Sequence, residues 1–218
     1  MKMQSCFLYA LTLFMTTSFG IVSAQNSTVA GSEFGIKGGV NMSNLYSDDV
    51  DDNNVLWGFN AGLFAAFPIA NNVFIQSEVL YTTKGAELEY DNNVISGAAK
   101  FKLNYIEVPL LVRLNITENF NIHAGGYASY LINAKLTNET ENGNAFEFDE
   151  DLNTDDFQTF DAGLSVGAGL DIKPVSIGLR YNYGLATVGK ERDFAGTNYT
   201  FPDAKNSNLN LYLSYKLN

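Results

Sequence analysis

The chain has little of several residue types on which catalytic and metal-binding chemistry depends. Its 218 residues include one cysteine, Cys6, and one histidine, His123. Because Cys6 lies within the expected N-terminal leader, disulfides and a thiol nucleophile are excluded for the mature chain. The HExxH and glycine-rich phosphate-binding motifs are absent. An enzyme would have to rely on His123 and carboxylates, so we expect no catalytic activity, no cofactor and no bound metal ion.

The chain also has few cations and, after its first segment, no long apolar run. Lys and Arg number 13 against 24 Asp and Glu, which gives a formal net charge of −11. Nucleic acid is not expected as a partner, because phosphate binding requires clustered Lys and Arg. No later run approaches the roughly 20 apolar residues of a membrane-spanning helix. Any insertion into a membrane must therefore be by strands.

The N-terminus has the features of a secretory signal peptide. Lys2 precedes an apolar stretch from Phe7 to Ile21, and Val22-Ser23-Ala24 supplies a cleavage site of small residues. We expect residues 1–24 to be removed as a signal peptide and residues 25–218 to form one domain.

The mature chain shows a strict alternation of apolar residues with small or polar ones. From Phe160 to Ile172 every second residue is apolar, and mostly Gly, Ser and Asp stand between. The alternation restarts at Val175, which predicts two antiparallel strands joined by a tight turn. The small face suits a crowded lumen and the apolar face suits lipid, as in an outer-membrane β-barrel. A β-sandwich with a glycine-rich core strand is the alternative.

Six further segments alternate in the same way, so the sequence predicts an all-β fold, an eight-stranded antiparallel up-and-down transmembrane barrel. The expected strands are 33–45, 57–67, 73–83, 100–115, 120–136, 160–172, 175–185 and 208–217. Short turns follow the second, fourth and sixth strands. Longer polar loops follow the first, third, fifth and seventh strands, and the loop after the third opens at Lys84-Gly85. Outer-membrane barrels have short periplasmic turns and long outer loops. We therefore expect both termini in the periplasm and the barrel in the bacterial outer membrane, in contact with lipid and lipopolysaccharide.

The fourth expected strand changes phase partway. Its apolar residues fall on odd positions up to Tyr105 and on even positions from Ile106 onward. If all of them face lipid, the outward face slips by one residue, and a β-bulge near Tyr105 is expected. Pro109 has no N–H to donate to a neighbouring strand. It is therefore expected beside such an irregularity, or at a position where no ladder N–H is needed.

Outward-facing aromatic residues are expected in two bands, one at each rim of the barrel. The outer rim would hold Trp57, Phe59, Tyr81, Tyr130, Phe160, Tyr181 and Tyr183, and the inner rim Phe34, Phe67, Phe120 and Tyr215. Two such bands are typical of the aromatic girdles at the two membrane interfaces.

Four charged residues fall on the inward face near the middle of their strands. They are Lys37, Glu78 and Arg180, together with Glu107 once the slip near Tyr105 is accepted. We expect these opposite charges to meet in one layer as a lumen ionic network, because charges buried there must be paired. Eight strands enclose a space that side chains just fill, so the lumen is expected to be plugged. A gated ion path is the alternative.

Several segments resemble the PorT-like outer-membrane β-barrel family. They are Gly35–Asn41, Gln76–Tyr81, Lys84-Gly85, Leu103–Leu111 and Gly184-Leu185. The Tyr-Ile-Glu-Val-Pro-Leu run within the fourth of these is the most specific, and the resemblance spans the whole mature chain. It implies an outer-membrane barrel, and one founding member of the family is tied to a protein-secretion system.

Two classes of function are therefore expected. The first is a structural or surface-interaction barrel whose acidic loops, at 48–52 and 139–156, form the contact surface. The second is a subunit of a protein-secretion or envelope-assembly machine, with protein partners at the loops or the periplasmic turns. The loops lack the ligand spacing of an EF-hand, so solvated loops are favoured over divalent-cation sites.

Overall fold

The structure is a computed structural model that describes residues 31–46, 55–92, 95–140, 148–152, 158–188, 192–194, 197–199 and 205–218. The expected signal peptide and the acidic loop 48–52 lie outside these residues. Among the described residues, no helix has the length and apolar character needed to cross a membrane.

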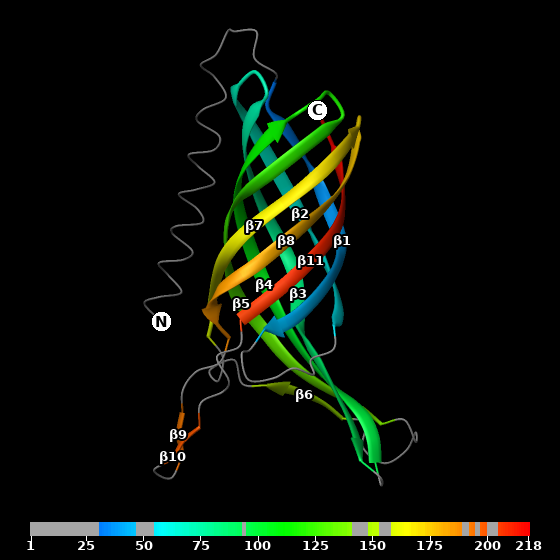
Figure 1. Cartoon of the computed structure of the whole chain (residues 1–218), viewed down its shortest axis with the longest axis vertical. Helices are drawn as coiled ribbons and strands as arrows, with labels where there is room; N and C mark the ends of the chain where they lie inside the picture. The colour runs from blue at the N-terminus through cyan, green and yellow to red at the C-terminus, as the bar shows by residue number, and fades with distance from the viewer. Residues whose placement is uncertain are drawn as a thin grey trace.

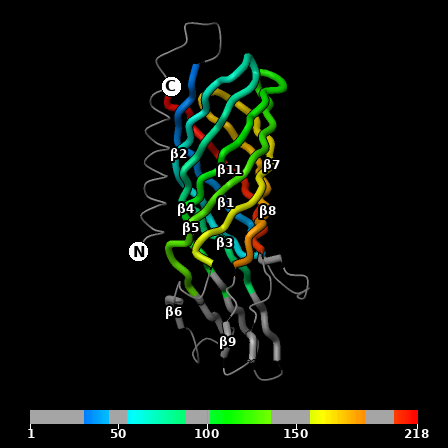
Figure 2. Tube along the Cα trace, turned by 90° about the vertical axis from the view of Figure 1, so that its left-hand side faces the viewer, coloured from blue at the N-terminus to red at the C-terminus, as the bar shows by residue number. Residues whose placement is uncertain are grey.

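Eight antiparallel strands close into a barrel (Figures 1 and 2). They are β1 (Glu33–Tyr46), β2 (Leu56–Ala70), β3 (Val73–Asn92), β4 (Ile95–Asn115), β5 (Phe120–Thr140), β7 (Phe160–Ile172), β8 (Val175–Thr187) and β11 (Lys205–Lys216). Each pairs with the barrel strands next to it in sequence, and β1 pairs with β11 to close the ring. The predicted eight-stranded barrel is confirmed.

The short connections and the chain ends of the barrel lie at one end of it (Figure 1). The connections are Asn71-Asn72, 116–119 and Lys173-Pro174. The first and last strands meet there, because the Leu217 amide donates to the Phe34 carbonyl at 2.8 Å. We call this the terminus end.

The opposite end carries strand pairing well beyond the barrel wall (Figure 1). The β3–β4 ladder continues to Asn92↔Ile95, whereas β2 pairs with β3 only as far as Asn60↔Thr82. The expected polar loop opening at Lys84-Gly85 is therefore wrong, because this segment continues β3. Apolar alternation ends where the strands leave the membrane, but ladder hydrogen bonds do not depend on it.

Three short strands lie in segments that were expected to be loops. β6 (Phe148–Leu152) pairs with the end of β5, while β9 (Arg192–Phe194) and β10 (Thr197–Tyr199) pair with each other. β6 therefore widens the extension of β3, β4 and β5 into a sheet of four strands.

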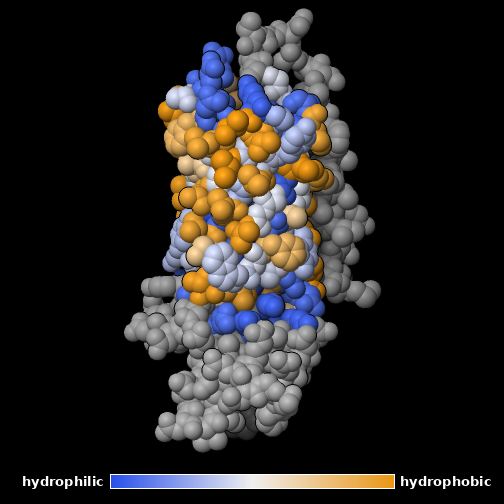
Figure 3. Space-filling view, turned by 90° about the vertical axis from the view of Figure 1, so that its right-hand side faces the viewer, coloured by the Kyte–Doolittle hydropathy of each residue, from blue (hydrophilic) through white to orange (hydrophobic). Residues whose placement is uncertain are grey.

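The wall has an apolar outer face and a polar inner face, as the alternation predicted. In β8, Ile177, Leu179 and Tyr181 are exposed while Arg180 and Asn182 are buried. On the face shown in Figure 3, apolar side chains form a belt across the barrel, with hydrophilic side chains above and below it. This belt is the surface that a β-barrel presents to the hydrocarbon of a membrane.

The phase change predicted in the fourth strand lies instead in its neighbour. Leu103 and Tyr105 are fully buried inside the barrel, on the same face of β4 as Glu107. The register passes from Asn104↔Asn133 to Tyr105↔Leu131, so β5 holds the extra residue, Ile132. The expected slip near Tyr105 in β4 is wrong, because the two apolar side chains fill the lumen with Leu131 and Ala134 rather than facing lipid.

Pro109 lies at a gap in the β3–β4 ladder. The pairs on either side are Ser77↔Leu110 and Leu80↔Glu107, with none between them. A proline cannot donate a ladder hydrogen bond, and this gap requires none.

Candidate functional site

Charged side chains run along the whole lumen, and they are the candidate functional feature of this barrel. The cations are Lys37, Lys84, Arg113, Arg180 and Lys216, and the carboxylates are Glu33, Glu78, Glu107, Asp161 and Asp171. All are buried except Glu33, which is partly exposed at the terminus end. The ten side chains divide into three clusters along the barrel axis.

The middle cluster is built on Glu78. The Arg180 guanidinium binds this carboxylate through two parallel hydrogen bonds, Nη1 to Oε2 and Nη2 to Oε1, each 2.7 Å long. Lys37 Nζ lies 3.0 Å from Oε1 and 3.6 Å from the centre of the Tyr212 ring. Two cations therefore share one carboxylate, and the ring face gives Lys37 a second, weaker partner.

The distal cluster lies beyond it, toward the extended sheet. Lys84 Nζ is 2.6 Å from Glu107 Oε2 and 3.4 Å from Asp161 Oδ2. The ammonium also lies 4.3 Å from the centre of the Tyr127 ring. Asn206 Nδ2 donates to Asp161 at 3.0 Å. Here one cation serves two carboxylates, the reverse of the middle cluster.

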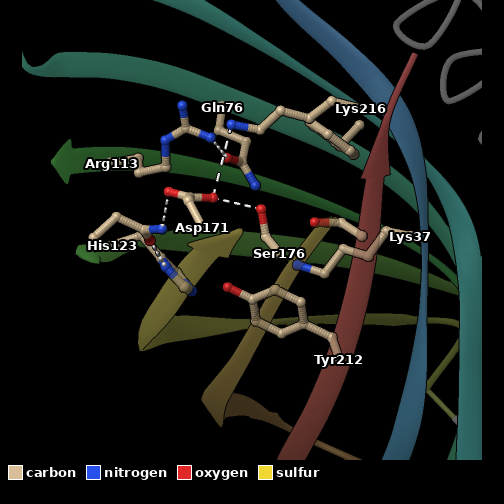
Figure 4. A pocket seen from close by; sticks show the side chains of 11 residues that line it. Lys37, Gln76, Arg113, His123, Asp171, Ser176, Tyr212 and Lys216 are labelled. Carbon is tan, nitrogen blue, oxygen red and sulfur yellow. Dashed lines mark hydrogen bonds and ion pairs between the residues drawn. The ribbon is translucent and has the colours of Figure 1, made fainter. Parts of the chain in front are cut away.

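The proximal cluster closes the terminus end. Glu33 accepts from Arg113 at 2.7 Å and from Lys216 at 3.0 Å. Asp171 accepts from Ser176, and from Asn121 at 2.9 Å, with Lys216 Nζ at 3.7 Å. Arg113, Asp171 and Lys216 come from strands far apart in sequence and line a small cavity (Figure 4).

The four lumen charges expected from the sequence are thus divided between two clusters. Lys37, Glu78 and Arg180 lie together, but Glu107 lies in the distal cluster with Lys84. The expectation of one layer fails because Lys84, assigned to a loop, is a fully buried strand residue. In β3 the even-numbered residues face inward, and extending this alternation past Thr82 would have predicted Lys84 as a lumen residue.

The charges of the proximal cluster were also missed, although each follows the alternation of its strand. Glu33, Arg113, Asp171 and Lys216 lie close to strand ends, where the sequence alone does not separate a solvated charge from a buried one. Their pairing joins β1, β4, β7 and β11, so it appears only once the barrel is closed.

Glycines leave space in the lumen for Tyr212, which packs against Lys37 of the middle cluster. A Cβ added at Gly169 would lie 2.9 Å from the Tyr212 hydroxyl, and one at Gly178 would collide with the Tyr212 ring. The Tyr212 side chain therefore lies across two glycines of the neighbouring strands, Gly178 of β8 and Gly169 of β7. The glycine-rich inner face predicted from the alternation has this packing role.

His123 is a buried lumen residue near the terminus end. Its Nε2 accepts from Arg180 Nε at 3.3 Å, and its Nδ1 lies 3.4 Å from Asn121 Oδ1. No group of three or more His, Asp or Glu side chains in the described part of the chain could hold a metal ion.

The eleven aromatic residues assigned to the girdles all lie on the outward face of their strands. Trp57, Phe59, Phe120, Phe160, Tyr181 and Tyr215 are exposed, and Phe34, Phe67, Tyr81, Tyr130 and Tyr183 are partly exposed. Two pairs are in contact, with ring centroids 5.7 Å apart for Phe34 and Phe67 and 5.6 Å apart for Phe59 and Tyr81.

Solved structures with this architecture share little sequence with the chain. Neisserial surface protein A is 17% identical, with 86% of this chain and 100% of that chain covered and a TM-score of 0.50. Ail, the attachment invasion locus protein of Yersinia pestis, solved with the heparin analogue sucrose octasulfate, is 15% identical over 85% of this chain and 99% of its own, with a TM-score of 0.48. At 17% identity the likeness to Neisserial surface protein A shows the fold alone. No curated protein matches the chain.

The family comparison covers most of the chain. Residues 23–188 match the model of the outer membrane protein beta-barrel domain. The match runs through β1 to β8, which supply seven of the eight barrel strands. The closed barrel and its apolar belt agree with it. The chain therefore belongs to the outer membrane protein beta-barrel domain family and is a protein of the bacterial outer membrane.

Proposed function

We propose that this protein is a non-enzymatic outer-membrane barrel with a structural or surface-interaction role, a plugged lumen and an extended sheet as its contact surface. The observation that carries the proposal is the paired charge network that occupies the lumen. Arg180, Lys84 and Glu78, each fully buried, belong to it. Transport of a solute would require these pairs to separate inside the barrel, where unpaired charges are costly.

The extended sheet supports the interaction role. It is formed by the ends of β3, β4 and β5 together with β6, at the end of the barrel opposite the terminus end (Figure 1). Its sequence is acidic, with Glu87, Glu89 and Asp91 in β3 and Asp149–Asp151 in β6. We propose that this sheet lies outside the cell and contacts partners that carry positive charge.

The orientation and processing of the chain are part of the same proposal. The signal peptide 1–24 is removed, residues 25–218 form the barrel, and the terminus end faces the periplasm. The aromatic residues on the outward face serve as the two girdles. The amino-terminal sequence of protein purified from outer membranes tests the cleavage, with Gln25 as the expected first residue.

The alternative is a subunit of a secretion or envelope-assembly machine, as the PorT-like resemblance implies. The most specific segment of that resemblance contains Glu107 and Pro109, which lie in the lumen and at a ladder gap. It therefore marks the construction of the barrel rather than a partner surface, which favours the first function.

Purification of the intact barrel from its native membrane in mild detergent separates the two functions. A surface-interaction barrel is expected to elute without stoichiometric partners. Recovery of fixed-ratio envelope proteins, retained after the extended sheet is deleted, would instead establish the machine subunit.

A further inference from the structure

We propose that the proximal cavity binds a small monovalent inorganic anion of halide size, such as chloride. The cavity measures about 10 Å³, which corresponds to a single water-sized occupant. Its wall includes three cations, Lys37, Arg113 and Lys216, but one carboxylate, Asp171 (Figure 4). The size admits one small inorganic ion rather than an organic anion, and the excess of cations in the wall disfavours a metal cation.

The positive charge of the wall is only partly neutralised by the carboxylates around it. Arg180 occupies both oxygens of Glu78, so Lys37 shares an oxygen that already accepts from the guanidinium. Glu33 and Asp171 balance Arg113 and Lys216 at the terminus end. On the other side of Lys37, Glu107 is bound by Lys84 at 2.6 Å. Lys37 is thus one cation in excess in this half of the lumen.

A donor without a partner gives a second indication. Arg113 Nη1 donates to Gln76 and Nη2 to Glu33, but the buried Nε has no hydrogen-bond partner among the described residues. Arg113 lines the cavity. A buried charged donor that lacks an acceptor is costly, and an anion would supply one. Water could accept the same hydrogen bond but would leave the excess charge of Lys37 in place.

The site would be reached from the terminus end. The side chains of Lys216 and Glu33 there are 8% and 18% exposed, whereas those of Lys37 and Glu78 are 2% and 0% exposed. An anion could therefore enter beside the Lys216–Glu33 pair without crossing the middle cluster. This inference concerns the interior of the barrel and is independent of the proposed contact surface.

The test compares wild type with Lys37→Met in a non-ionic detergent. Thermal unfolding midpoints are measured in chloride, bromide and gluconate at equal ionic strength. Wild type is expected to unfold at a higher temperature in the two halides than in gluconate, and Lys37→Met is expected to lose that difference. Lys173→Met is the matched control, because it removes an exposed turn cation at the same end and is expected to keep the difference.

A measurement on wild type alone keeps the test decisive if Lys37→Met does not fold. The ³⁵Cl NMR line of chloride is expected to be broadened by the wild-type barrel, and added bromide is expected to reverse the broadening. Equal midpoints in halide and gluconate, or broadening that bromide does not displace, would overturn the site. So would a halide effect that persists in folded Lys37→Met.

Discussion

Arg180 is the fully buried side chain on which the middle cluster depends. It binds both oxygens of Glu78 and donates to His123. Arg180→Ala leaves Glu78 with Lys37 as its cation, while Glu107 keeps Lys84. The structure therefore confines the effect of the substitution to Glu78 and leaves Glu107 paired.

We expect Arg180→Ala to lower the free energy of unfolding by about 3–5 kcal/mol, because Glu78 loses two hydrogen bonds from a charged donor, each worth about 1.5–3 kcal/mol. Urea unfolding followed by fluorescence of the single tryptophan, Trp57, measures it. The triple variant Lys37→Met, Glu78→Gln and Arg180→Met should recover part of the loss, because no charge then remains in the middle cluster. A single variant as stable as wild type would show that the cluster does not stabilise the fold.

Lys84 has the same role in the distal cluster. Lys84→Met leaves Glu107 and Asp161 buried without their shared cation, so we expect a loss of about 3–5 kcal/mol. Lys100→Met is the matched control. Lys100 lies in β4 of the same hairpin and forms a 3.7 Å ion pair with Glu87 that is partly exposed. Removing this pair should lower the free energy of unfolding by about 0–1 kcal/mol. Equal effects of the two substitutions in urea unfolding would contradict the burial of Lys84.

The β3–β4 hairpin combines a barrel segment and an extension. Beyond Thr82 the strand β3 no longer pairs with β2, and its remaining ladder pairs are with β4 alone. We expect that replacing 88–99 with a two-residue Asn-Gly turn will leave the barrel folded, because Glu87 and Lys100 are already paired in register.

The shortened variant should keep the difference in gel migration between boiled and unboiled samples. It should also unfold in urea within about 0.5 kcal/mol of wild type, as surface changes usually do. Loss of the folded gel form would show that the extension is required for closure of the barrel. If the folded gel form is retained, the shortened variant can be used to test whether the extended sheet is a contact surface.

The lumen as a whole is expected to be closed to ions. Five cations and five carboxylates fill it, so separating the pairs would expose unpaired charges to a narrow interior. Purified wild-type protein in a planar bilayer should give no steady single-channel steps. Such steps would instead establish the gated ion path.

In the proposed orientation of the barrel, the extended sheet lies outside the cell. Protease added to whole cells should therefore cut the chain between Thr137 and Asp156, a range that includes β6. Cleavage only after the outer membrane is opened would reverse the orientation. Cells that produce the shortened β3–β4 variant provide a control, because 137–156 is unchanged in it.

The barrel and its location follow from the sequence because both depend on a local pattern. Alternation of apolar with small residues places one face toward lipid and the other inward, strand by strand, without knowledge of the neighbours. The inward positions of Lys37, Glu78, Glu107 and Arg180 were predicted in this way and agree with the burial of these side chains. Short turns likewise identified the terminus end from connection length alone.

Only the tertiary structure decided how those positions combine. The register between strands sets which inward charges meet, so Glu107 lies beside Lys84 and Asp161 rather than Glu78. The same register places the extra residue in β5, which lets Tyr105 and Leu103 fill the lumen although their sequence pattern favours lipid. An apolar side chain is stabilised by leaving water whether it enters the lumen or the membrane. Its polarity therefore does not predict which of the two it faces. Closure of the barrel makes that choice, because the lumen must be filled and its charges paired.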